Sequence, residues 1–481
     1  MNAAQNFCDL CHLRQSAEFS GYSDSDLEAW RSAESGPSEG SPCSACFGIL
    51  QSGREIVSKV ESELELAGYE DVFACQLSVI LSADILFQTF VEKLSRPGWT
   101  DSGMPCTEFK DLVRGLIYRA TITEQQDPHM PKLFVDVRID GPSVQVPDEL
   151  MKAVNQAVKH KPGNFKKFRT RESVNIADVQ QFIESTKGSI TKVYKALFPS
   201  RTVPDGPNMR SELREAFVTA PSSRASFSVS LKRETLYLSG KYVKASREFG
   251  QSQWDANETS IAESICPVVC ELLRSPVDKC QFSASGREDM DVRMLGSGRA
   301  FVLQVGDAKR LKSLTDSSLA ELVIDTGDVI VRGLKWADKG VMDWLHWSTE
   351  QHTKIYQSVV WTEQVLPSQS LLDEVFEQNR NIKVFQKTPL RVLHRRTEHT
   401  REKTMYSVKT ERINDHFAIV TLRASAGAYI KEFIHSDLGR TTPSFCDLVF
   451  GTFVPCDILQ LDVLEVEQDE SEDYVPVWNR S

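Results

Sequence analysis

Two pairs of closely spaced cysteines stand within the first fifty residues. Cys8 and Cys11 form one C-x-x-C pair, and Cys43 and Cys46 form a second. Each pair aims two thiolates at one point, and two pairs complete a tetrahedral site of four cysteines. The intervening segment is rich in Ser, Gly, Glu and Asp, so a flexible loop can join the pairs at small entropic cost. We therefore expect a structural zinc ion in a module formed by residues 1–50.

A second group of candidate residues lies in the C-terminal half of the chain. The stretch SGREDMDVR, residues 285–293, places a glycine before a cluster of charges. That order suits a tight loop that presents one carboxylate, the side chain of Asp289, into a cleft. Taken alone, the pattern is more typical of a charged turn on the surface.

Two further stretches supply an aromatic side chain and a lysine. Tyr356 lies in the strand-like run 354–361, where the ordinary interpretation is a tyrosine of the core. Lys431 lies in an otherwise apolar run, where an unpaired charge would cost several kcal/mol. Lys431 therefore needs a carboxylate partner. Asp289 is a reasonable candidate, although residue types alone do not choose it.

The composition of the chain is that of a globular protein. Its 481 residues carry a net charge of -11, with 41% hydrophobic and 26% charged residues, which predicts two or three domains. The longest apolar stretch, around residues 77–87, is too short to cross a bilayer, so we expect no membrane association. The N-terminus lacks the features of a secretory signal. We expect an intracellular protein with reduced thiols.

The elements that must position these residues divide into two domains beyond the cysteines. Helical spacing of apolar residues runs from 46 to about 94, and a β-like run follows at 133–137. A Pro-rich and Ser-rich break at 199–223 marks the best domain boundary. Strands and helices then alternate, starting with a strand at 227–231. We expect an α+β fold with a mixed, mostly antiparallel sheet and flanking helices.

At this point several motifs together resemble one family. They are GRED-x-DVR-x-LG from Gly286, QKTPLRVLHRR at 386–396, and YIKEF-x-H-x-D-x-GRT from Tyr429. They are similar to those of the archaeal and eukaryotic tRNA pseudouridine synthases that modify the TΨC loop. The resemblance is dense over 225–465 and thin over 50–220. It implies a pseudouridine synthase core at 225–475 and an α/β, THUMP-containing RNA-binding domain at 51–220, preceded by the zinc module.

The resemblance also implies roles for individual residues. Asp289 would be the nucleophile, and Tyr356 would stack on the target base and help to move the C5 proton. Ile430 and Lys431, in a YIKEF strand, would supply an apolar wall and the basic partner of Asp289. Leu459, in the closing strand, would line the pocket.

Basic residues are the expected contacts to RNA. Arg287 precedes the nucleophile, and Arg391, Arg395 and Arg396 follow one another in the QKTPLRVLHRR motif. The stretch 151–171 adds seven Lys or Arg residues and no acid. For each basic group, a solvated surface is an equally good interpretation.

The implied reaction is the isomerisation of uridine in the TΨC arm of tRNA, at U55, with U54 left open as an additional target. No atom is gained or lost, so no organic cofactor is expected. We expect a monomer in the nucleus, the cytoplasm or both, and other structured RNAs stay open as partners. The alternative function is a non-catalytic factor for RNA binding or RNA processing. A THUMP-bearing thiolation or methylation enzyme would need an ATP or methyl-donor motif, which the sequence lacks.

Overall fold

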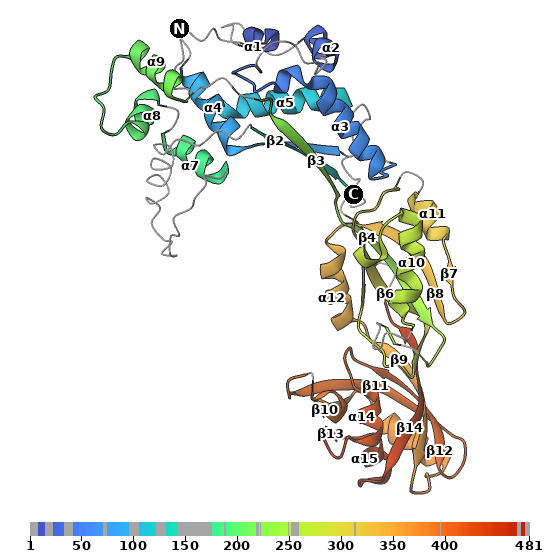
Figure 1. Ribbon diagram of the computed structural model, residues 1–481. Coiled ribbons are helices and arrows are strands. Elements are labelled where there is room, and N and C mark those ends of the chain that lie inside the picture. The colour runs from blue at the N-terminus through green and yellow to red at the C-terminus, as the bar shows by residue number, and fades with distance from the viewer. Residues whose placement is uncertain are drawn as a thin grey trace. The chain divides into compact units, whose positions relative to one another are not determined.

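The structure is a computed structural model. It describes residues 8–14, 23–32, 42–70, 75–95, 105–121, 131–141, 176–186, 189–217, 221, 223–248, 250–251, 259–311, 314–394, 396–468 and 473–476. The chain forms two compact units, Met1–Arg233 and Glu234–Ser481, and each is described by itself (Figure 1). Across the described residues, every helix is too short or too polar to cross a bilayer.

A small sheet lies at the centre of the first unit. β1 (Cys75–Leu81) pairs in parallel with β2 (Leu133–Asp140), and β3 (Ser226–Arg233) pairs antiparallel to β2. Alternate residues of β1 and β2 are buried, as expected for strands that face a core on one side. Helices α3 (Gly53–Leu66) and α5 (Pro105–Thr121) pack against these strands. The N-terminal helices α1 (Asp9–Arg14) and α2 (Asp24–Ser32) and the 3-10 turn η1 (Ile49–Gln51) complete this layer.

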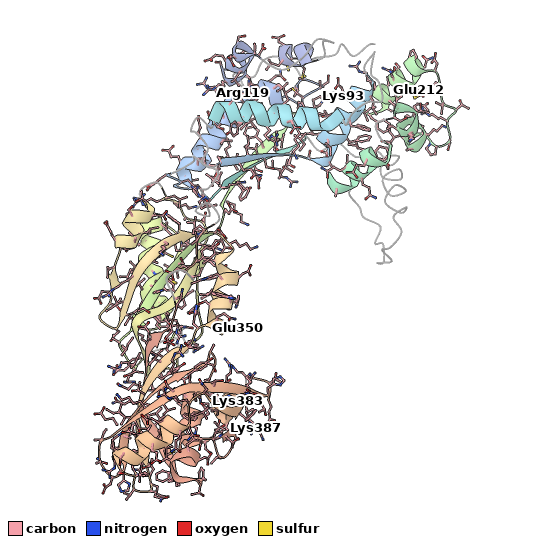
Figure 2. All side chains as sticks on the ribbon, turned by 180° about the vertical axis from the view of Figure 1, so that it is seen from behind. Lys93, Arg119, Glu212, Glu350, Lys383 and Lys387 are labelled. Carbon is pink, nitrogen blue, oxygen red and sulfur yellow. The ribbon has the colours of Figure 1, made fainter. Side chains whose placement is uncertain are left out.

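Four helices build a second core in the first unit: α4 (Ala83–Leu94), α7 (Ile176–Thr186), α8 (Ile190–Leu197) and α9 (Gly206–Phe217). Phe87 of α4 makes an edge-on contact with Phe217, with ring centroids 5.6 Å apart. Glu212, labelled in Figure 2, accepts hydrogen bonds from Tyr194 and Arg201. These contacts join α8 to α9.

The first unit differs from the sequence prediction in two places. The helical interpretation of residues 46–94 is wrong between the helices α3 and α4, where the alternating residues of β1 form a strand. The strand predicted at 227–231 exists as β3, but it pairs with β2 and so belongs to the first unit rather than to the second. The basic stretch 151–171 lies outside the described residues.

The second unit is organised by one large sheet. In its described residues, eleven strands are hydrogen-bonded in the order β13-β10-β11-β12-β9-β14-β6-β4-β8-β7, with β5 also paired to β6. All pairings are antiparallel except that of β14 with β6. The predicted α+β fold with a mixed, mostly antiparallel sheet is therefore confirmed. The strands are β4 (Leu236–Lys244), β5 (Cys280–Ala284), β6 (Val292–Val305), β7 (Ile324–Asp325), β8 (Val329–Ala337), β9 (Lys354–Thr362), β10 (Ile382–Lys387), β11 (Thr400–Arg412), β12 (Phe417–Ala424), β13 (Thr441–Thr442) and β14 (Cys456–Val466).

Helices cover both faces of this sheet. Ala300 and Val302 of β6 pack against α12, while Phe301 between them stacks with Phe282 of β5 on the opposite face. A capping box formed by Ser260 and its N3 residue starts α10 and satisfies the free N–H groups of its first turn. The helices are α10 (Ile261–Leu273), α11 (Asp316–Glu321), α12 (Val341–Gln351), α13 (Gln369–Gln378), α14 (Ile430–His435) and α15 (Phe445–Phe450), with the short 3-10 turns η2 (Val277–Lys279) and η3 (Leu390–Val392).

The strand β14 connects the two halves of the large sheet. It runs antiparallel to β9, with Val463 opposite Tyr356, and parallel to β6, with Leu461 opposite Val292. The turn that precedes β6 and the start of β9 thereby flank the same stretch of β14, one on each side of it. This arrangement brings residues from four separate parts of the sequence into one site.

Candidate active site and metal centre

A cavity of about 600 Å³ lies in the second unit where β6, β9 and β14 meet. Volumes of this size are typical of sites for small ligands. Its walls come from the turn before β6, from β9, β11 and β14, and from η3 and α14. They include Arg287, Asp289, Tyr356, Arg391, Lys431 and Leu461. We call it the Asp289 cavity.

The turn that carries Asp289 is held by a buried ion pair. The side chains of Glu288 and Arg299 are only 1% and 3% exposed, and Nε of Arg299 lies 2.9 Å from a Glu288 carboxylate oxygen. Arg299 also donates to the backbone oxygen of Ser285 at 2.8 Å. Gly286 has a φ of 91°, and a Cβ there would lie 3.0 Å from the Arg299 guanidinium. Glycine is therefore favoured at this position, because other residues rarely adopt this φ and would also crowd Arg299.

Further hydrogen bonds fix both sides of the same turn. The Tyr242 hydroxyl donates to Glu288, at 2.8 Å and 3.0 Å from its two oxygens, and burial raises the pKa of this tyrosine well above its ordinary value. The Gln251 amide donates to the Gly286 carbonyl at 3.0 Å. Lys244 donates to the carbonyl of Asp289 itself at 3.2 Å. The backbone of the turn is thus fixed, while the Asp289 side chain lines the cavity.

Among the residues that the structure describes, the nearest cation to Asp289 is an arginine. Arg391 Nη1 lies 3.1 Å and 3.0 Å from the two carboxylate oxygens of Asp289. Its Nε lies 2.8 Å from Glu432, whose side chain is 1% exposed. An arginine held between two carboxylates keeps a fixed orientation. Glu432 therefore positions Arg391 on Asp289, and no sequence motif had pointed to this role.

Lys431 contacts Asp289 less closely than expected. Its Nζ is 3.5 Å from Asp289, but 2.7 Å and 2.9 Å from the two oxygens of Asp291. The expected pair of Lys431 and Asp289 therefore exists as the longer of two contacts. Two cations share the pair of aspartates, and Arg391, which the sequence suggested only as a contact to RNA, is the closer partner of Asp289.

Lys431 lies on a helix, so the prediction of a strand for the YIKEF motif is wrong. Ile430, Phe433 and Ile434 are buried at spacings of three and four residues, which is the period of a helix. The short helix α14 places Lys431 and Glu432 side by side, one beside the aspartates and the other beside Arg391. Ile430 lines the Asp289 cavity, as an apolar wall would.

Tyr356 lines the cavity from the middle of the sheet. Burial raises the pKa of its phenol to about 12, although the Arg299 charge opposes the shift. The hydroxyl consequently keeps its proton at neutral pH. In this state Tyr356 can stack on a base and donate a hydrogen bond.

The closing strand lines the cavity with other residues than the leucine predicted from the sequence. Leu459 is 57% exposed and does not line the Asp289 cavity. The register of β14 against β9 shifts between Ile458 and Gln460, which leaves Leu459 as the extra residue of a bulge. Leu461 and Val463, after the bulge, form the apolar wall instead.

The remaining arginines lie at the rim or outside the described residues. Arg287 is exposed and lines the cavity. Arg396 also lines it and donates to the Tyr429 hydroxyl at 3.1 Å. Arg395 lies outside the part of the chain that the structure describes.

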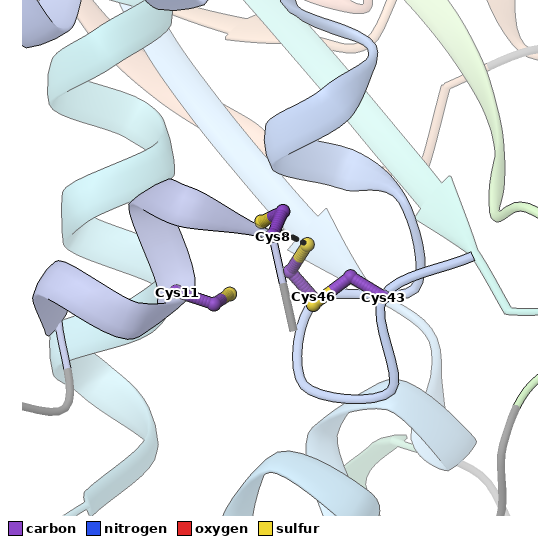
Figure 3. Close-up of side chains that lie close together, drawn as sticks. All are labelled: Cys8, Cys11, Cys43 and Cys46. Carbon is purple, nitrogen blue, oxygen red and sulfur yellow. Dashed lines mark hydrogen bonds between the residues drawn. The ribbon is translucent and has the colours of Figure 1, made fainter. Parts of the chain in front are cut away.

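The four cysteines of the two C-x-x-C pairs come together in the first unit (Figure 3). All four Sγ atoms lie within 4.8 Å of one another, and those of Cys8 and Cys46 are 3.8 Å apart. Four thiolates at about 2.3 Å from a tetrahedrally bound ion would be separated by about 3.8 Å. Cys11, Cys43 and Cys46 are buried, so water has little access to the site. The donor set therefore fits a structural metal ion.

The backbone explains how the second pair is shaped. Phe47 and Gly48 have φ values of 57° and 82°, in the left-handed region that favours glycine. The Phe47 N–H donates to the Cys43 carbonyl at 2.8 Å, and the Ile49 N–H donates to the Cys46 carbonyl at 2.9 Å. This tight turn aims both thiols at one point.

The cysteine cluster is not a separate module of residues 1–50. Cys11, Cys43 and Cys46 belong to the same hydrophobic core as Val79 of β1 and Val135 of β2. A metal ion held there would fix the N-terminal segment against the small sheet. The expected boundary between 50 and 51 therefore passes through a continuous core.

We expect one metal ion per chain, and we expect the double substitution Cys8→Ser/Cys11→Ser to release it. Structural sites of this kind contribute about 10–16 kcal/mol of apparent binding free energy, so the first unit should lose stability. Elemental analysis measures the metal, and circular dichroism during heating measures the unfolding. Cys75→Ala removes a buried thiol of the same core outside the cluster and should leave the metal content unchanged. Equal metal content in the double variant and the unsubstituted protein would contradict the site.

Comparisons with known proteins agree with the family resemblance. Residues 237–467 match the family model described as Pus10, C-terminal. A Drosophila melanogaster protein provisionally named tRNA pseudouridine synthase Pus10 is 34% identical over 307 residues, 61% of this chain and 58% of the relative. The tRNA pseudouridine synthase Pus10 of Mus musculus is 35% identical over 245 residues, 49% of this chain and 45% of the relative. The protein of the same name from Pyrococcus furiosus is 33% identical over 255 residues, 53% of this chain and 62% of the relative.

The match covers less than two thirds of each of these relatives. The match to the family model includes the turn of Asp289, the strand of Tyr356 and the helix of Lys431, because all three lie within 237–467. The resemblance predicted from the motifs is confirmed: residues 237–467 are similar to the C-terminal region described by the Pus10 family model.

Proposed function

We propose that this chain is a tRNA pseudouridine synthase that isomerises uridine in the TΨC loop, with U55 as its target and U54 as a second candidate to be tested. The observation that carries the proposal is the position of Asp289. Its carboxylate lies between two cations, Arg391 and Lys431, at the wall of a cavity that also contains Tyr356. The names of the relatives support the choice of tRNA.

The geometry suits a reaction that detaches and reattaches a base. The Asp289 carboxylate contacts two cations, which favour its charged form, and a carboxylate anion can attack C1′ of the ribose. The flipped uracil would stack on Tyr356 and lie against the apolar side chains of Ile430, Leu461 and Val463, which keep water from the reacting carbon. Because the base itself attacks C1′ again, a second carboxylate to activate water is not required.

Zinc is the metal that we propose for the cysteine cluster, because four thiolates in tetrahedral geometry are typical of structural zinc sites. We also propose that the first unit is the THUMP-containing domain that binds the body of the tRNA. Since one chain supplies every wall of the Asp289 cavity, a monomer would be sufficient for catalysis. We propose that it acts in the nucleus, the cytoplasm or both.

An exposed strand beside the cavity supports RNA binding in the second unit. Lys383, Phe385 and Lys387 alternate on the outward face of β10, and the two lysines are labelled in Figure 2. Lys383 pairs with Glu402 at 2.9 Å. An exposed aromatic ring between cations is typical of surfaces that stack bases and contact phosphates. β10 leads directly into η3, which carries Arg391.

Asp289→Asn should lower pseudouridine formation at least about 1000-fold, because the amide keeps the shape of the side chain but is a poor nucleophile. Binding of tRNA should change little. Tritium release from 5-³H-uridine tRNA measures the reaction, and filter binding measures affinity. Asp278→Asn, in the exposed turn η2, is the matched control and should keep normal activity. Wild-type protein that binds tRNA but forms no pseudouridine would favour the non-catalytic alternative.

Arg391→Met should lower the single-turnover rate about 100-fold or more, because Arg391 makes the two shortest contacts to the Asp289 carboxylate. Lys431→Met should have a smaller effect, since Lys431 lies closer to Asp291 than to Asp289. Both rates are measured at saturating tRNA. A larger loss in Lys431→Met than in Arg391→Met would restore the pairing expected from the sequence.

Lys387→Ala should weaken tRNA binding and reduce the slope of log K against log salt by about 0.7–0.9, the loss expected for one phosphate contact. Titration at several salt concentrations gives both quantities. Lys409→Ala removes another exposed lysine, near the far end of β11, and should leave the slope unchanged. Identical slopes for the two variants would remove β10 from the RNA-binding surface.

A further inference from the structure

A buried lysine lines the Asp289 cavity and takes no part in the contacts described so far. Lys354, the first residue of β9, is 6% exposed. Residues two apart on a strand face the same side, so Lys354 and Tyr356 both face the cavity, and both line it. Lys354 Nζ donates to the backbone carbonyl of His352 at 3.1 Å. An ammonium has three donors, so further donors are available to a ligand.

The surroundings of Lys354 are positively charged. Arg299 of β6 and Lys403 of β11 also line the cavity, and Lys403 donates to the Ala426 carbonyl at 2.6 Å. Glu288 already neutralises Arg299. Among the described residues, no carboxylate forms an ion pair with Lys354. The opposing residues on the neighbouring strands β12 and β14 are Ala424 and Val466, which are uncharged.

Tyr356 and Glu350 are further ionisable groups of the cavity lining, which also includes Asp289, Arg391 and Lys431. Burial and the charge of Arg401 lower the pKa of Lys403. Glu350, labelled in Figure 2 near the end of α12, opposes this shift without reversing it. Burial, then the charges of Arg299 and Lys403, lower the pKa of Lys354 to about 8. Lys354 is thus mostly charged at neutral pH and loses its charge as the pH rises through about 8.

A buried cation without an anion is costly, and such groups are frequent at sites where a ligand supplies the missing charge. The proposed reaction generates a negative charge near Tyr356. As a carboxylate oxygen of Asp289 bonds to C1′, the C1′–N1 bond breaks and its electron pair leaves with the uracil ring. When C5 later attacks C1′, the carboxylate leaves, C5 loses its proton and N1 gains one. No atom or electron is gained overall.

We propose that the ammonium group of Lys354 binds the uracil ring after it leaves the ribose and stabilises the negative charge shared by its N1, O2 and O4 atoms. The inference rests on the proposed function, because only a detached base carries this charge. Lys354 would be a catalytic residue that acts on the base, while Asp289 acts on the ribose. Its interaction is strongest when the charge has developed, so it lowers the barrier more than it strengthens binding.

The test compares Lys354→Met, Lys354→Arg and the wild-type protein in single-turnover reactions at saturating tRNA, from about pH 6 to about pH 10. Loss of one electrostatic donor of this kind lowers a rate about 100-fold, and we expect this loss for Lys354→Met at pH 7, with the Kd for tRNA unchanged. The wild-type rate should fall as the pH rises through about 8. Lys354→Met should lack this fall, and Lys354→Arg should keep most of the rate and show the fall at higher pH. Lys409→Met, on the surface of β11, is the control for removal of a lysine.

Several outcomes would overturn the inference. A wild-type rate in Lys354→Met across the pH range would remove the role of the charge. A raised Kd with an unchanged rate would make Lys354 a contact to an RNA phosphate instead. If Lys354→Met does not fold, the pH profile of Lys354→Arg decides. A fall in its rate at the same pH as in the wild-type protein would exclude Lys354 as the group that causes the fall. A wild-type protein that forms no pseudouridine would refute the proposed function itself, which is a separate result.

Discussion

The buried ion pair between Glu288 and Arg299 is the interaction on which the site depends. Removing one partner of such a pair costs about 3–5 kcal/mol, because the other charge is left buried and unpaired. The pair fixes the turn from Ser285 to Asp289 against β6. The same Arg299 opposes the rise of the Tyr356 pKa and helps to lower that of Lys354. One interaction therefore holds the turn that carries Asp289, and one of its partners also influences the charges of Tyr356 and Lys354.

The parts of the site that local sequence specifies were predictable. Two C-x-x-C pairs predict four clustered thiols because each pair is a local turn. The glycine and charges at 285–293 likewise predict a tight loop with an exposed carboxylate. The path of the chain between residues 289 and 391 decides which cation reaches Asp289. No local sequence pattern specifies this path. Arg391 was therefore recognised as basic, while its role could not be inferred.

Two errors in the prediction have local physical causes. The YIKEF motif contains a helical spacing of apolar residues, but six residues are too few for that period to be distinguished from a strand. Leu459 has the right chemistry for a pocket wall, yet a single extra residue in β14 turns it to solvent and brings Leu461 inward. A bulge changes the face of the sheet on which every later residue of the strand lies. The alternation of apolar residues alone does not show where a bulge occurs.

The central position of β14 has a consequence for synthesis on the ribosome. β14 spans residues 456–466, yet it separates β6, which ends at residue 305, from β9, which ends at residue 362. The middle of the sheet therefore stays open until translation has passed residue 466. The pairings that close it join residues 94 positions apart or more. Such long-range contacts form slowly, and unpaired strand edges invite association with other chains. We expect a nascent chain of this protein to need protection at β6 and β9 until β14 is made. The Asp289 cavity is likewise incomplete until then, because Leu461 and Val463 of β14 line it.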